Sequence, residues 1–247
     1  MEVFTQALSQ RFRTLAPDLR GYGRSRASGP FAMVDHLTDL EALLAQEQVQ
    51  DFYLLGWSLG GILAMELALR HPQRVKGMIL IATAARPWGS HPATNWTDDL
   101  FTAIAGLINA ASPGARWNIE LFGKRSLFRY LVNQQTPSTY KYLARYALPA
   151  YLQTSRWANQ ALGQALRSRY NRLEAITQIA CPCLMLAGEG DRHITADSSQ
   201  ETAQHLPHCT LKIYANVAHL FPWEISQGVI QDIENWLDGQ PLALPSP

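Results

Sequence analysis

The most constraining feature of this 247-residue chain is a glycine-rich turn with a serine at its apex, Gly56-Trp57-Ser58-Leu59-Gly60-Gly61. The apolar run Phe52 to Leu55 precedes this turn, and the run Ile62 to Leu69, apolar nearly all round, follows it. This order predicts a buried strand, a sharp turn and a buried helix, since the small residues let the backbone turn tightly. Such a turn holds the hydroxyl of Ser58 exposed, as a nucleophile requires.

Strands and helices alternate through most of the chain. Because this alternation implies a parallel sheet with right-handed crossovers, we predict an α/β fold with helices on both faces of a mostly parallel sheet. The predicted strands are Phe12 to Pro17, Phe52 to Leu55, Val75 to Ala82, Cys183 to Ala187 and Leu211 to Tyr214. The predicted helices are Met33 to Gln48, Ile62 to Leu69, Ser198 to His205 and a last one carrying Ile225, Val229, Ile233 and Leu237.

The alternation stops between residues 86 and 172, where aromatic residues are dense and only helical periodicity remains. This segment has eleven Lys and Arg and three acidic residues, whereas the rest of the chain has ten basic and seventeen acidic residues. We predict an inserted helical lid at 86–172, a core at 1–85 and 173–239, and a flexible tail at 240–247. The positive charge of the segment 86–172 fits either solvated helix faces, a lid docked on an acidic core, or an anionic partner.

Composition limits the class of protein. Hydrophobic residues make up 47% and charged residues 17% of the chain, which is typical of a globular domain with a large core. No run is long enough for a membrane span, and Met1 to Gln10 lacks the pattern of a signal peptide, so we expect a cytoplasmic location. Cys181, Cys183 and Cys209 are too few for a disulfide framework. Cys181 and Cys183 are expected to be core thiols, and no metal or cofactor is expected. No nucleic-acid-binding motif accompanies the basic residues.

Two later strands end in residues that could assist a serine. Gly188-Glu189-Gly190-Asp191 follows one of them, and His219 follows the other, so the order is Ser58, Asp191, His219. Since the carboxyl ends of parallel strands gather at one edge of a sheet, we expect these three to meet. Glu189 is the alternative acid, and His219 could instead be a structural residue. We expect Asp197 to cap the next helix and the other histidines (His36, His71, His91, His193, His205 and His208) to lie on the surface or in loops.

With these motifs, and with Asp18-Leu19-Arg20-Gly21-Tyr22-Gly23-Arg24-Ser25, the chain from Phe12 to Leu237 resembles the lid-bearing α/β-hydrolase superfamily. The turn from Gly56 to Gly61 is similar to that of carboxylesterases that cleave pimeloyl methyl esters. The resemblance implies that Ser58 is the nucleophile, His219 the base and Asp191 the carboxylate that orients it. It also implies that the Leu59 N–H binds the oxyanion, and that Trp57 and Trp88 line a substrate pocket.

The implied activity is that of a serine hydrolase, which cleaves a small carboxylic ester or thioester through an acyl-enzyme. The substrate would be a small ester, either anionic or bound to a carrier. Because the triad does not separate the reactions of this superfamily, two alternatives stay open. One is a cofactor-independent lyase or a carbon–carbon bond hydrolase of the same fold, and the other is a non-catalytic fragment or ligand-binding member.

The chain departs from the family pattern at its front. Family members have three more strands before the one expected at Phe12 to Pro17, and the third ends in a His-Gly loop that supplies a second oxyanion N–H. By that topology the third strand would lie between Phe12 to Pro17 and Phe52 to Leu55. We therefore expect either that these two strands close up into a five-stranded sheet or that the protein starts upstream of Met1. On the first alternative Leu59 is the one oxyanion donor, and we then expect activity to be weakened about a hundred- to a thousandfold.

Overall fold

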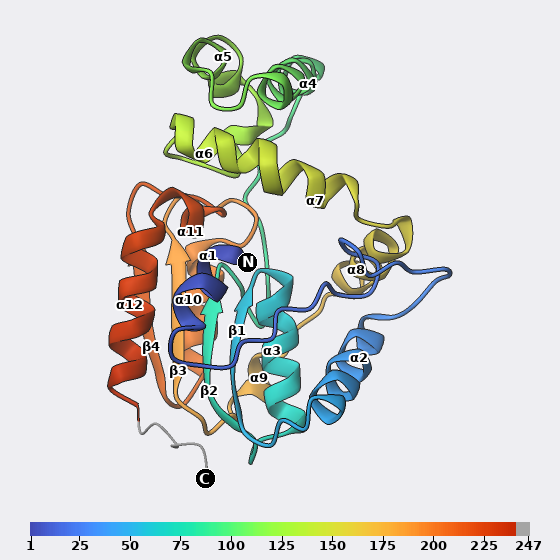
Figure 1. The fold of residues 1–247 in the computed structure, drawn as a ribbon, viewed down its shortest axis with the longest axis vertical. Helices are drawn as coiled ribbons and strands as arrows, with labels where there is room; N and C mark the ends of the chain where they lie inside the picture. Colours follow the sequence, from blue (N-terminus) through green and yellow to red (C-terminus); the bar gives the residue numbers. More distant parts are fainter. Residues whose placement is uncertain (241–247) are drawn as a thin grey trace.

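A computed structural model describes residues 1–240 of the chain. Its centre is a parallel four-stranded sheet in the order β1-β2-β3-β4 (Figure 1). The strands are β1 (Phe52–Trp57), β2 (Val75–Ile81), β3 (Cys183–Gly188) and β4 (Cys209–Tyr214). The predicted α/β class and parallel sheet are confirmed, and each of these four strands was expected from its apolar run.

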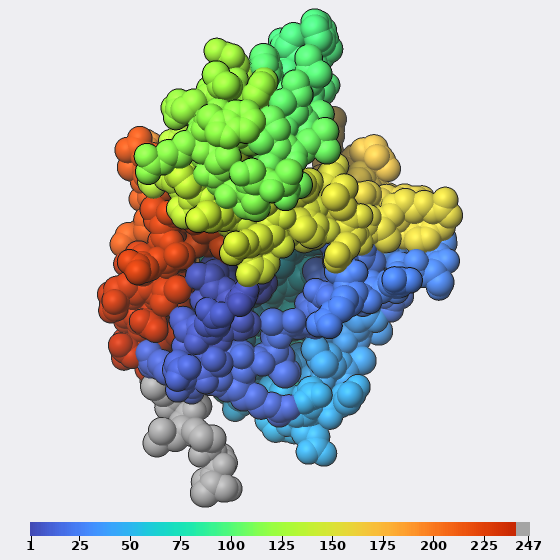
Figure 2. All heavy atoms as spheres, turned by 45° about the horizontal axis from the view of Figure 1, so that its top comes forward, coloured from blue at the N-terminus to red at the C-terminus, as the bar shows by residue number. Residues whose placement is uncertain are grey.

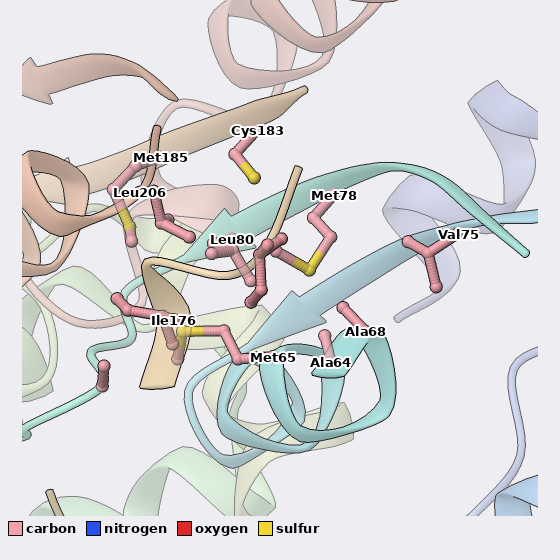
Figure 3. Packing of buried hydrophobic residues seen from close by; sticks show 12 residues of the cluster. Ala64, Met65, Ala68, Val75, Met78, Leu80, Ile176, Cys183, Met185 and Leu206 are labelled. Atoms are coloured by element: carbon pink, nitrogen blue, oxygen red, sulfur yellow. The ribbon is translucent and has the colours of Figure 1, made fainter. Parts of the chain in front are cut away.

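Helices cover one face of the sheet with an apolar layer. These helices are α3 (Leu59–Arg70), α9 (Leu173–Ile176) and α10 (Ala196–His205). Figure 3 shows Met65 from α3 and Ile176 from α9 lying against Leu80 of β2, all three withdrawn from solvent. The thiol-bearing Cys183 belongs to the same cluster, so it packs as a small apolar side chain.

The opposite face is covered by helices from the two ends of the chain. They are α1 (Glu2–Leu8) and α12 (Ser226–Asp238), with the short α11 (Phe221–Glu224) just before the latter. Phe4 of α1 and Ile233 of α12 are buried against Ile79 and Leu184 of the sheet. Helices therefore lie on both faces, as predicted. The amphipathic α2 (Met33–Gln46) packs outside α3 through Leu37.

One strand prediction is wrong. Residues 12–17 form no strand, so β1 is an edge strand of the sheet, and the five-stranded arrangement, one of the two expected alternatives, is absent from residues 1–240. The segment is held through side chains: the ring of Phe12 packs on Tyr53 at 5.8 Å, and Arg13 pairs with Glu47, the residue directly after α2. Pro17 also has no N–H to donate to a strand ladder.

The chain between β2 and β3 is helical, which agrees with the periodicity of that region. We call residues 96–167, from the start of α4 to the end of α8, the helical segment. It covers one end of the molecule (Figures 1 and 2). Its elements are α4 (Trp96–Ala111), α5 (Arg116–Leu121), η1 (Gly123–Arg125), η2 (Leu127–Tyr130), α6 (Pro137–Tyr142), the π-helix η3 (Leu143–Ala147), α7 (Leu148–Leu152) and α8 (Arg156–Arg167).

The remaining expectations concern the tail, the thiols and membranes. The tail predicted at 240–247 lies, apart from Gln240, outside the described residues. Cys181, Cys183 and Cys209 are free thiols, of which Cys183 is buried and the other two are partly buried. Of the helices within residues 1–240, none has the length and apolar character needed to cross a membrane.

Candidate functional site

The turn between β1 and α3 is held in a tight, strained conformation. Ser58 has φ 53° and ψ −118°, a backbone conformation that residues with a side chain rarely adopt. A Cβ on Gly56 would lie 2.3 Å from the carbonyl oxygen of Gly60, and one on Gly61 would meet Thr83 at the same distance. The hydroxyl of Thr83 donates to the carbonyl of Ser58 at 2.8 Å. The glycines of the turn are therefore required by space as well as by flexibility.

The structure brings together the three residues expected to meet at the sheet edge. The Oγ of Ser58 lies 3.2 Å from Nε2 of His219, and Nδ1 of the same ring lies 2.7 Å from Oδ2 of Asp191. Asp191 and His219 are 3% and 6% exposed, so their contact is shielded from water. A hydroxyl, an imidazole and a carboxylate in this chain can pass a proton from the serine to the ring.

The carboxylate that contacts His219 is that of Asp191 rather than that of the alternative Glu189. The second oxygen of Asp191 accepts the backbone N–H groups of His193 and Ile194 at 2.8 and 3.0 Å, which fixes the carboxylate. Glu189 is exposed. The prediction that Asp197 caps the following helix is wrong: the cap of α10 is Thr195, whose hydroxyl accepts from the N–H of Ser198, and Asp197 lies in the first turn.

Of the two tryptophans expected near the site, only Trp57 has a described contact with the three residues. Its ring lies 5.0 Å from that of His219, and its Nε1 donates to the carbonyl of His219 at 3.1 Å. Trp223 then packs edge-on against Trp57, and Tyr142 of α6 stacks on Trp223 at 4.6 Å. Trp88 is 37% exposed, and its described contacts are to Arg86 and Thr195.

Leu59 is the first residue of α3, directly after Ser58. The first N–H groups of a helix have no acceptor within it and point out of the end, where they favour negative charge. The position of Leu59 therefore suits an anion that forms at the hydroxyl of Ser58.

Of the histidines expected on the surface or in loops, His193 lies beside His219 and contacts His91 in turn. The ring of His193 is 5.0 Å from that of His219. Nδ1 of His193 is 2.9 Å from Nε2 of His91. Desolvation lowers the pKa of His193 to about 4, and the nearby His219 and His91 add to the effect. His193 is therefore neutral near pH 7. Its position two residues after Asp191 is the signal that could have found it.

Glu224 was also missed. Its carboxylate accepts the N–H of Ala218 at 2.8 Å, the N–H of Asn133 at 2.9 Å and the N–H of Gln134. Burial raises the pKa of this carboxyl above its ordinary value, and the three N–H donors oppose that shift. Sequence spacing alone, five residues after His219, did not distinguish it from a surface glutamate.

The other polar groups provide no metal site. Across residues 1–240, no group of three or more His, Cys, Asp or Glu side chains is arranged to hold a metal ion. His36, expected on the surface, is instead fully buried between the rings of Tyr22 and Phe31, and neither of its ring nitrogens has a hydrogen-bond partner. Its burial arises because α2 packs under the loop that carries those two rings.

Curated relatives resemble the chain over most of its length. The pimeloyl-[acyl-carrier protein] methyl ester esterase of Nitrosomonas europaea is 28% identical over 231 residues, which cover 87% of this chain and 81% of that protein. The magnesium-chelatase 30 kDa subunit of Rhodobacter capsulatus is 29% identical over 244 residues, which cover 94% and 80%.

Solved structures agree in fold. An esterase from Exiguobacterium antarcticum matches with a TM-score of 0.72 at 19% identity, covering 96% of this chain and 86% of that one. An esterase from Thermogutta terrifontis matches with a TM-score of 0.67 at 23% identity, covering 96% and 84%. A family model described as "alpha/beta hydrolase fold" matches residues 2–224. The chain therefore belongs to the α/β-hydrolase fold family.

Proposed function

We propose that this protein is a serine hydrolase that cleaves a carboxylic ester or thioester through an acyl-enzyme. The observation that carries the proposal is the hydrogen-bonded chain from Ser58 through His219 to Asp191, with separations of 3.2 and 2.7 Å. Esterases among the relatives of the chain support the same class of reaction.

In the first half-reaction, Oγ of Ser58 attacks the carbonyl carbon of the substrate while Nε2 of His219 takes the hydroxyl proton. This requires Nδ1 of His219 to carry its proton toward Asp191, which stabilises the imidazolium. The N–H of Leu59 donates to the carbonyl oxygen as that oxygen becomes negative. When the tetrahedral intermediate collapses, the bond to the alcohol or thiol breaks and Nε2 returns the proton to the leaving group.

In the second half-reaction, water attacks the acyl group on Ser58, and His219 again serves as the base. The new tetrahedral intermediate expels Ser58, which recovers its proton from Nε2, and the carboxylic acid is released. The neutral ring of His193 beside His219 adds no competing positive charge when the imidazolium forms.

We further propose that the helical segment is a lid that receives an ester bound to an acidic carrier. In the wider region 86–172, ten of the basic residues lie from 116 onward, against one acidic residue. Several have salt-bridge partners, such as Arg129 with Asp98 and Lys124 with Glu120. Others are exposed without a described salt bridge: Arg116, Arg125, Lys141, Arg145, Arg156, Arg167 and Arg169. A relative named for a carrier-bound ester supports this reading.

The reaction is tested with a fluorophosphonate, which reacts with activated serines, followed by mass-spectrometric mapping of the adduct. We expect an adduct on Ser58 that is absent in His219→Ala. A burst of p-nitrophenol from a p-nitrophenyl ester would then report the acyl-enzyme and separate the hydrolase from a lyase. A folded protein that does not label would exclude the proposed reaction.

The carrier proposal has its own test. Reversal of four exposed charges (Lys141→Glu, Arg145→Glu, Arg156→Glu and Arg167→Glu) should lower kcat/KM for a carrier-bound ester at low salt, because steering depends on unscreened charge. Turnover of a small uncharged ester should be unchanged. Equal turnover of the carrier-bound ester by both proteins would contradict a role of this charge.

A further inference from the structure

The carboxylate of Glu224 joins two parts of the chain that are far apart in sequence. Its Oε1 accepts the N–H of Ala218, the residue directly before His219. Its Oε2 accepts the N–H groups of Asn133 and Gln134, which lie between η2 and α6 of the helical segment. One side chain therefore binds the loop of the proposed base and the helical segment at the same time.

A second link holds the other side of His219. The N–H of Leu220, the residue directly after His219, donates to the carbonyl of Leu131 at 2.9 Å. His219 is thus flanked on both sides by residues bound to positions 131–134, directly at Leu220 and through Glu224 at Ala218. A displacement of positions 131–134 would move the backbone on both sides of the imidazole.

A carboxylate fits this arrangement, and an amide of the same shape does not. The three partners of Glu224 are all backbone N–H groups, so both of its oxygens must accept. An amide has one oxygen and one NH2 group, and the NH2 group would face an N–H wherever it pointed. Since N–H bonds to a carboxylate are stronger than those between neutral groups, the loss of charge weakens all three.

We propose that Glu224 is a positioning residue for His219, through which the placement of residues 131–134 of the helical segment controls the reactivity of Ser58. The inference rests on the proposed function. In this arrangement, a substrate or carrier that binds the helical segment and holds residues 131–134 in place also fixes the distance between Nε2 of His219 and Oγ of Ser58. A misplacement of about 1 Å at such a site lowers rates by roughly a hundredfold.

The first test compares Glu224→Gln with wild type and with the matched control Glu174→Gln, which changes an exposed glutamate on α9. We expect Glu224→Gln to slow fluorophosphonate labelling of Ser58 and to lower kcat for a p-nitrophenyl ester by about ten- to a hundredfold, with a smaller change in KM. Rates are normalised to the folded fraction from circular dichroism. A purely structural role would alter that fraction and leave the normalised kcat unchanged, which would overturn the proposal.

The second test uses wild-type protein and needs no variant to fold. Phosphonylation of Ser58 places a charged imidazolium and a bulky group at the site, and we expect it to change amide hydrogen exchange at residues 131–134. Exchange at those residues that is identical before and after labelling would overturn the coupling. If wild-type protein does not label at all, the proposed function itself fails; if it labels and Glu224→Gln labels at the same normalised rate, only the role of Glu224 fails.

Discussion

The central strands of the sheet and the helical segment differ in how completely their residues are buried. Every residue of β3 and all but one of β2 are buried. In the helical segment, Leu107 and Tyr151 are 75% and 74% exposed while Asn109 is only 2% exposed. Apolar burial stabilises both regions, but the apolar cluster of the helical segment, which includes Ile119, Tyr140 and Leu143, is smaller than the clusters on the two faces of the sheet. Hydrogen bonds from buried polar groups such as Asn109 add to it.

The residues of the proposed chemistry follow strands of the sheet rather than lying in the helical segment. Ser58 follows β1, Asp191 follows β3 and His219 follows β4, so the sheet sets the spacing of all three. The helical segment contacts the site through Glu224, Leu131 and the stack of Tyr142 on Trp223. Such contacts break at lower free energy than a buried sheet does, which suits a part that must admit a substrate.

The largest expected effect comes from the core. His219→Ala should lower ester hydrolysis by about ten-thousandfold or more, because the serine then has no base and the oxyanion donor acts alone. Thermal stability should also fall, because the variant leaves Oδ2 of the buried Asp191 without its partner, so rates are normalised to the folded fraction. The measurement is single-turnover hydrolysis beside circular dichroism, with Glu174→Gln as the control. A loss below tenfold would place the chemistry elsewhere.

The next largest expected effect is a loss of stability when a side chain is added at Gly56, in the turn before Ser58. Gly56→Ala places a Cβ against the backbone of Gly60, where no side chain can move aside, so we expect a loss of about 3 kcal/mol in the free energy of unfolding. Gly228→Ala in α12 is the control: no atom lies within 4 Å of its new Cβ, and it should stabilise by ~0.5–1 kcal/mol. Urea denaturation measures both. Equal changes in the two variants would show that the close approach at Gly56 is relaxed in solution.

The sequence allowed prediction of the core because each of its elements carries a local signal. The apolar runs of β1 to β4 and the glycines around Ser58 predicted the sheet, and the order Ser58, Asp191, His219 placed the site. The predicted strand Phe12 to Pro17 is wrong because the burial of Phe12 reflects packing on Tyr53 rather than strand pairing. A short apolar run does not distinguish the two.

Residues that act through tertiary contacts left no local signal. Glu224 binds backbone N–H groups from two distant segments, and His36 is buried only because the loop of Tyr22 and Phe31 folds over it. A single polar residue in an amphipathic stretch is typical of a surface position. Their true environments depend on chain crossings that periodicity does not encode.

In the helical segment, Asn109→Ala should act locally. The amide of Asn109 donates to the carbonyl of Tyr140 at 2.8 Å and accepts the N–H of Gly114 at 2.9 Å. Its removal leaves both groups unsatisfied, which costs about 1–3 kcal/mol. We expect faster hydrogen exchange in α4 and α6 with unchanged exchange in β2 and β3. Uniformly faster exchange would mean that the two regions unfold as one unit, against the comparison drawn above.

The smallest expected effect concerns the contact between the helical segment and the loop that covers His36. His36 of α2 lies under the loop of Tyr22 and Phe31, and the neighbouring Gly21 accepts the N–H of Ser155 from the helical segment at 2.8 Å. Burial lowers the pKa of His36 below its ordinary 6.5, although the nearby Asp39 opposes the shift and Arg20 adds to it. His36 therefore binds a proton more readily in the unfolded chain than in the folded chain. The free energy of unfolding should fall as the pH drops below about 6.5.

His36→Leu removes that proton-binding site and leaves an apolar side chain between the two rings. We expect its free energy of unfolding, measured in urea at pH 5 to 8, to depend less on pH than that of wild type, with the difference largest at the acid end. His208→Gln, at an exposed position, should keep the wild-type slope. If the free energies of unfolding of His36→Leu and wild type depend equally on pH, the loop of Tyr22 and Phe31 must open readily enough to hydrate His36. The helical segment, which contacts that loop through Ser155, would then be less firmly attached to the core than its contacts imply.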